Sequence, residues 1–160
     1  MGGVIAIDPG RRSGFAVFDS SGVLVGAGVL SDAAILARPP CPVSGVAVIE
    51  MPVVYPTRNA DPNDLIDLAI LVGDLRGYYR RQGFEVRLVK PRTWKGAVPK
   101  AIHNERTLRA LTPEERALLP LRPRPWGSPR APLTSPASPA SLHDHNMLDA
   151  VGLGLWQLKR

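Results

Sequence analysis

The fold is decided near the start of the chain, by the stretch Val4-Ile5-Ala6-Ile7-Asp8-Pro9-Gly10. An apolar run of this length is typical of a buried strand, and the Pro-Gly pair ends it. Asp8 is then a carboxylate at the end of a strand, beside the core but within reach of solvent. Such an acid is either a turn or cap residue or part of a functional site. The positions of the next carboxylates decide between them.

The rest of the chain predicts four further strands and several helices. The strands are expected at residues 14–19, 23–30, 46–50 and 85–89. Apolar residues at helical spacing predict a long helix capped by Asn63 or Asp64 and ending at Gln82-Gly83. Shorter helices are expected at about 32–38, 99–111 and 142–159. A three-strand meander followed by βα units predicts one mixed α/β sheet with helices on its faces.

A chain of 160 residues has the length of a single domain. Residues 113–140 interrupt its regular pattern because they contain eight prolines. We predict a loop or insert there, without a regular element.

The charge balance favours a polyanionic partner. The chain has 20 Lys and Arg against 14 Asp and Glu, a formal net charge of +6. Ten of the basic residues lie between Arg76 and Arg109, where the acids are Glu85 and Glu105. This basic segment is either an ordinary solvated surface or a surface that binds nucleic acid.

Composition also indicates where the protein works. No apolar stretch is long enough to span a bilayer, and the N-terminus has no secretion signal, so we expect a soluble protein with no membrane partner. The single cysteine, Cys41, cannot form an internal disulfide, and a reducing compartment such as the cytoplasm is the natural inference.

Three carboxylates are candidate metal ligands. Asp8 and Glu50 each end a predicted strand, so they emerge at one edge if those strands are neighbours. Asp149 lies on a largely apolar helix, where a buried carboxylate needs a partner or a metal. His145 and Asn146 precede it by four and three residues, on the same helix face. Such oxygen-rich sites suit Mg²⁺ or Mn²⁺.

Four segments resemble, in chain order, the RuvC family of Holliday-junction resolvases, and within it the compact RuvC-like proteins of bacteria and phages. They are Ile7-Asp8-Pro9-Gly10-x-x-x-Gly14, Val48-Ile49-Glu50, Lys90-Pro91-x-x-Trp94-Lys95-Gly96-x-x-x-Lys100 and Asn146-x-x-Asp149-Ala150-x-Gly152-Leu153. The resemblance implies an RNase H-like fold and a metal-dependent, structure-specific endonuclease. It further implies a homodimer that nicks opposing strands of a four-way DNA junction, in a bacterial cell or encoded by a phage.

The resemblance also assigns site residues. Asp8, Glu50 and Asp149 fall on the family's metal-binding acids. Two Mg²⁺ or Mn²⁺ ions at such a group of acids would activate a water and stabilise the leaving oxygen of a phosphodiester. Lys95 and Lys100 match the family's phosphate-contacting and catalytic lysines.

One ligand position departs from the family pattern. Asn146 stands where the family has an Asp or a His, so Asn146, His145 and Asp144 are all candidates for the fourth ligand.

Other residues are candidates for DNA contact. Lys90 and Arg92 lie in the basic segment beside the matched lysines. Tyr55 either stacks on an unpaired base, as an aromatic residue does in relatives, or anchors its own loop. Trp94 is predicted to be a packing residue beneath the basic segment.

Other functions remain open at this point. An RNase H-like nuclease acting on other branched DNA or on RNA shares the same features, and so does a catalytically silent junction-binding module. The actin-like and sugar-kinase ATPases also open with such an aspartate, but they need a second domain and a second phosphate loop, for which this chain has no room.

Overall fold

The computed structural model describes residues 2–37, 39–40, 44–54, 61–121 and 143–160. Cys41, Tyr55 and most of the predicted Pro-rich insert therefore lie outside the described residues. No helix in the described part of the chain is both long and apolar enough to cross a membrane.

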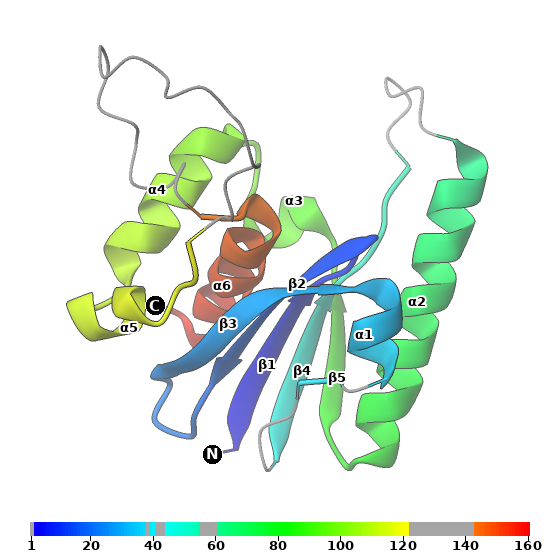
Figure 1. The fold of residues 1–160 in the computed structure, drawn as a ribbon, viewed down its shortest axis with the longest axis horizontal. Coiled ribbons are helices and arrows are strands. Elements are labelled where there is room, and N and C mark those ends of the chain that lie inside the picture. Colours follow the sequence, from blue (N-terminus) through cyan, green and yellow to red (C-terminus); the bar gives the residue numbers. More distant parts are fainter. Residues whose placement is uncertain (1, 38, 41–43, 55–60, 122–142) are drawn as a thin grey trace.

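A single mixed sheet of five strands forms the centre of the molecule, in the order β3-β2-β1-β4-β5 (Figure 1). The strands are β1 (Gly3–Asp8), β2 (Arg12–Phe18), β3 (Leu24–Ser31), β4 (Gly45–Glu50) and β5 (Glu85–Val89). The first three pair antiparallel as a meander, whereas β4 and β5 continue the sheet parallel to β1. These strands confirm the predicted ones to within two residues at each end.

Helices cover both faces of the sheet because its central strands are apolar on both sides. The helices are α1 (Asp32–Ala37), α2 (Pro62–Arg81), α3 (Pro91–Trp94), α4 (Lys100–Ala110), α5 (Pro113–Ala117) and α6 (His145–Leu158). Ile5 and Ile7 of β1 pack with α1 and α2, whereas Val4 and Ala6 pack with α6 and its neighbours. This alternation follows the two-residue period of a strand. Figure 1 shows α1 and α2 on one side of the sheet and α3 to α6 on the other.

Two short helices were not predicted. The expectation that residues 113–140 hold no regular element is wrong at its start, because Pro113–Ala117 forms α5. Proline is tolerated in the first turn of a helix, and the Thr112 and Glu115 side chains form a capping box there. Pro91 likewise begins α3 as well as ending β5.

Candidate active site

Asp8 and Glu50 lie side by side at one edge of the sheet, as the sequence predicted. The parallel strands β1 and β4 are neighbours, and their register pairs Ile7 with Ile49, so each acid follows directly. Asp8 is on the same face of β1 as Ala6, and Glu50 is on the same face of β4 as Val48. That face is the one covered by α6. Both side chains are only partly buried.

The third carboxylate, Asp149, comes to this edge from α6. Its side chain is 3% exposed. The helix crosses β2 and β1, and it can lie close to them because Gly14 of β2 has no side chain. A Cβ atom at Gly14 would overlap the backbone carbonyl of Asn146, in the first turn of α6. The Gly14 of the sequence motif therefore allows the close approach that brings Asp149 towards Asp8.

Two lysines from the segment after β5 partly neutralise these acids. The Lys100 Nζ lies 2.9 Å from the Asp149 Oδ2. The Lys95 Nζ lies 3.6 Å from the Glu50 Oε2 and 3.7 Å from the Asp149 Oδ2, so its ammonium group bridges the two carboxylates. The sequence placed both lysines near the site, but the ion pairs with Glu50 and Asp149 appear only in the structure.

The electrostatics show that the three acids act on one another. Burial raises the pKa of the Asp8 carboxyl well above its ordinary value, and the nearby charges of Glu50 and Asp149 raise it further. Burial also raises the pKa of Glu50, against the opposing effects of Lys95 and of a hydrogen bond from Trp94. Carboxylates that repel one another in this way favour a bound cation.

These residues fit a divalent cation in chemistry, although they are not arranged as a closed metal cage. Among the residues that the structure describes, no group of three or more His, Cys, Asp or Glu side chains is placed to hold a metal ion. However, the Asp149 Oδ1 is buried without a hydrogen-bond partner among the described atoms. A buried carboxylate oxygen of this kind needs a partner. Three carboxylates are also the hard oxygen donors that Mg²⁺ prefers.

The three candidates for a fourth ligand have different surroundings. The Asp144 side chain caps α6 by accepting from the Asn146 backbone N–H at 3.0 Å, and it pairs with Arg12 at 2.9 Å. The Asn146 side-chain amide donates to the Arg12 carbonyl at 2.7 Å, which ties the start of α6 to β2. His145 is exposed at the first residue of the helix. Asp144 and Asn146 therefore both already have structural contacts with β2 or with the start of α6.

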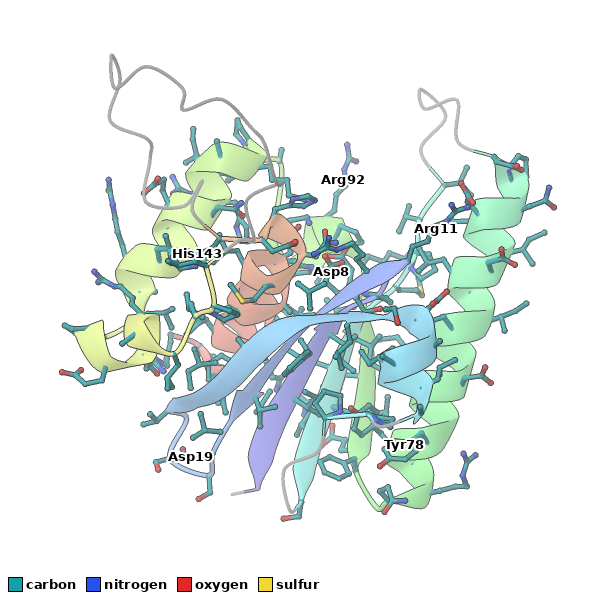
Figure 2. The ribbon with its side chains drawn as sticks, in the orientation of Figure 1. Asp8, Arg11, Asp19, Tyr78, Arg92 and His143 are labelled. Atoms are coloured by element: carbon teal, nitrogen blue, oxygen red, sulfur yellow. The ribbon has the colours of Figure 1, made fainter. Side chains whose placement is uncertain are left out.

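The predicted DNA-contacting residues lie around this edge. Lys90 and Arg92 are exposed at α3, and Figure 2 shows Arg92 at the same end of the sheet as Asp8. Lys100 is 53% exposed. Tyr55 is not among the described residues.

Sequence reasoning missed one contact at the site. Trp94, predicted to serve packing, also donates its indole N–H to the Glu50 Oε2 at 2.7 Å. The sequence could have indicated part of this contact, because the N–H of a buried tryptophan usually finds a hydrogen-bond acceptor.

Comparison with known proteins bears on the fold. No protein-family model matches the chain, and no curated protein matches it. Among solved structures, it is similar to T. thermophilus RuvC in complex with Holliday junction substrate, with a TM-score of 0.53 and 15% identity over 98% of this chain and 92% of that one. A second Thermus thermophilus RuvC structure gives a TM-score of 0.46 and 17% identity, over 98% of this chain and 93% of that one. The chain therefore has the RNase H-like fold of RuvC, as its sequence motifs predicted.

Proposed function

We propose that this protein is a metal-dependent, structure-specific endonuclease that resolves four-way DNA junctions by paired, symmetric nicks. The observation that carries the proposal is the convergence of Asp8, Glu50 and Asp149, from three separate elements, at one edge of an RNase H-like sheet. The RuvC structure with this fold holds a Holliday junction substrate, which supports a branched DNA as the partner.

In the proposed site, the three carboxylates hold Mg²⁺ or Mn²⁺, with Asn146 or His145 as an additional ligand. A divalent cation held by these residues would supply the positive charge needed to activate water for attack on a phosphodiester and to stabilise the leaving oxygen. A bound cation would favour the charged forms of Asp8 and Glu50, whose pKa values are raised by burial, and the core beneath them fixes their strands. Hydrolysis forms one bond from the water oxygen to phosphorus and breaks the bond from phosphorus to the leaving oxygen, and one proton of the water ends on that leaving oxygen.

The lysines contribute positive charge at the same place. Lys95 is 24% exposed and stands between two acids, so its ammonium group is placed to offset negative charge on a bound phosphate. Lys90 and Arg92 are more exposed and bind the DNA backbone outside the reacting group.

Paired nicking needs two active sites, and one copy of this chain contributes only one of them. A homodimer places the two copies on one junction, and exposed apolar residues on α2 provide a surface for it.

The test is cleavage of four-way, flap and linear DNA in Mg²⁺ and in Mn²⁺. We expect the native protein to cut the four-way junction, and Asp8→Asn, Glu50→Gln and Asp149→Asn each to lose cleavage by at least about a hundredfold while still binding the junction. Asp67→Asn is the matched control, since Asp67 is an exposed acid on α2. Wild-type cleavage by all three site variants would show that the assigned site is wrong.

A junction-binding module without catalysis is the second candidate function. It is favoured by Asn146, a weaker ligand than a carboxylate, and by the open arrangement of the three acids among the described residues. Tight binding of the four-way junction by the native protein, with no cutting in either metal, would select this function instead.

A further inference from the structure

Trp94 contacts the proposed metal ligand Glu50 directly. Trp94, at the end of α3, is 8% exposed. The indole Nε1 donates to the Glu50 Oε2 at 2.7 Å, and the Lys95 Nζ lies 3.6 Å from the same oxygen. Both contacts therefore fall on Oε2, and Oε1 takes part in neither.

The indole ring itself is held by three neighbours. The His103 ring of α4 packs edge-on against it, with 4.9 Å between centroids and an interplanar angle of 75°. The Lys95 Nζ lies 4.9 Å from its centroid, a cation–π contact. On the α6 side, a Cβ atom at Gly152 would lie 3.1 Å from the ring, so the absence of a side chain there gives the indole its room. A ring confined in this way holds its N–H in one direction.

We propose that Trp94 is a positioning residue for Glu50. Its N–H holds one carboxylate oxygen in place and so leaves the other oriented as a cation ligand. A residue that served packing alone would need only the apolar surface of the ring. Hydrogen-bonding partners that orient metal ligands in this way commonly change metal affinity by ten- to a hundredfold when they are removed. The proposal rests on the proposed function, in that Glu50 is taken as a metal ligand.

The experiment measures Mn²⁺ binding to the full chain in the absence of DNA, by electron paramagnetic resonance and calorimetry. Trp94→Phe removes the N–H and part of the ring. Replacement of Trp94 by 3-benzothienylalanine keeps the bicyclic shape and removes only the N–H. We expect both variants to bind Mn²⁺ about tenfold more weakly than the native protein. Trp156→Phe, at a tryptophan of α6 that is 38% exposed, is the matched control and should leave the affinity unchanged.

Repeating the Trp94 replacement in a Glu50→Gln variant tests whether Trp94 changes Mn²⁺ affinity by way of Glu50. In Glu50→Gln, whose own Mn²⁺ affinity is the reference, adding benzothienylalanine at position 94 should produce little further loss. Interacting residues show such non-additive effects, whereas independent ones add. An equal loss in both backgrounds would overturn the positioning role.

The failures of the two proposals can be told apart. If Asp8→Asn weakens Mn²⁺ binding but the benzothienylalanine protein binds as tightly as the native one, the positioning role is overturned and the site stands. If Asp8→Asn also binds Mn²⁺ with native affinity, the site is wrong and the inference about Trp94 is overturned with it. A urea unfolding curve for each variant shows whether Trp94→Phe loses Mn²⁺ affinity because the protein is partly unfolded. If it does, the Mn²⁺ affinity of the benzothienylalanine protein alone tests the positioning role.

Discussion

Asp149 shows how single residues set the charge balance of the site. One of its oxygens pairs with Lys100 at 2.9 Å, while the other is buried without a hydrogen-bond partner among the described residues. A carboxylate in this position depends on positive charge nearby, because burial without compensation is costly. Lys95 and Lys100 supply that charge from outside the acid cluster.

Removing the charge of Lys100 should make the folded protein less stable. In metal-free buffer, Lys100→Met should lower the free energy of unfolding by about 1 kcal/mol, because Asp149 loses its nearest cation. Saturating Mg²⁺ should restore much of the loss, since a bound cation supplies the missing charge. Urea denaturation with and without Mg²⁺ measures both effects. Lys90→Met, at an exposed lysine, is the control, and an equal loss from it would contradict the argument.

At the scale of elements, the approach of α6 to β2 brings the third acid to the sheet. The contact depends on Gly14, which faces the backbone of Asn146. The start of α6 is further tied to β2 through the Asn146 side chain and through the pair between Arg12 and Asp144. A displacement of α6 here moves Asp149 directly.

Gly14→Ala tests this packing. Its new Cβ would overlap main-chain atoms that no rotamer change can move, so we expect a loss of about 3 kcal/mol or more in the free energy of unfolding, with weaker Mn²⁺ binding. Gly26→Ala makes the same change in β3, where nothing lies within 4 Å of the added carbon. That control should be close to neutral. Thermal and urea unfolding of the two variants, followed side by side, measure the difference.

The short helix α5 is held by a separate ion pair. Glu115 accepts from the Leu24 backbone N–H at 2.8 Å, and its two oxygens each lie 2.8 Å from an Arg160 guanidinium nitrogen. These hydrogen bonds lower the pKa of Glu115 from 4.5 to about 2. The Glu115 side chain is 2% exposed, so these contacts tie α5 to the C-terminal residue Arg160 and to Leu24 of β3.

The lowered pKa predicts a specific acid sensitivity. Between pH 4.5 and about 2, the unfolded state binds a proton at Glu115 that the folded state does not, so stability rises with pH in that window. This contribution is fully present above pH 4.5 and is lost as the pH falls towards 2. Glu115→Gln should therefore destabilise the protein at pH 7 and flatten its pH dependence. Urea unfolding at pH 7 and pH 3 measures this, and Asp67→Asn, at an exposed acid of α2, is the control.

At the scale of the whole molecule, the face of the sheet opposite the site carries an apolar surface. On α2, Ile66 and Ile70 are 57% and 59% exposed, and Ala69 and Gly73 are exposed on the same side of the helix. Their spacing follows a helical stripe that points away from the sheet. Gly73 has open space around it, so another helix can approach closely there. We take this stripe as the dimer surface of the proposed resolvase.

Ile70→Glu should therefore convert the proposed dimer into a monomer, because it places a charge in the centre of the stripe. Sedimentation velocity or light scattering measures the mass. Ile102→Glu makes the same substitution at another half-exposed isoleucine, on α4, and should leave the dimer intact. The Ile70→Glu monomer should still bind Mn²⁺, but it should no longer nick opposing strands together. A native protein that is monomeric at assay concentrations would contradict the assignment.

Local pattern explains how much of the fold was predictable. All five strands and the four longer helices lie within a few residues of their expected positions, because apolar periodicity and turn residues act over short distances. The Thr112-x-x-Glu115 cap and the tolerance of proline in a first turn were also readable, but the density of prolines after residue 113 outweighed them.

The sequence by itself determined the type and order of the five strands and the four longer helices, and the place of Asp8 and Glu50 at two strand ends. Each of those features depends on residues that are close along the chain. Only the tertiary structure decided that Trp94 bonds to Glu50, that Lys95 and Lys100 pair with the acids, and that α6 approaches β2 at Gly14. These contacts join residues far apart in sequence, and they form only where helix packing against the twisted sheet brings the side chains together.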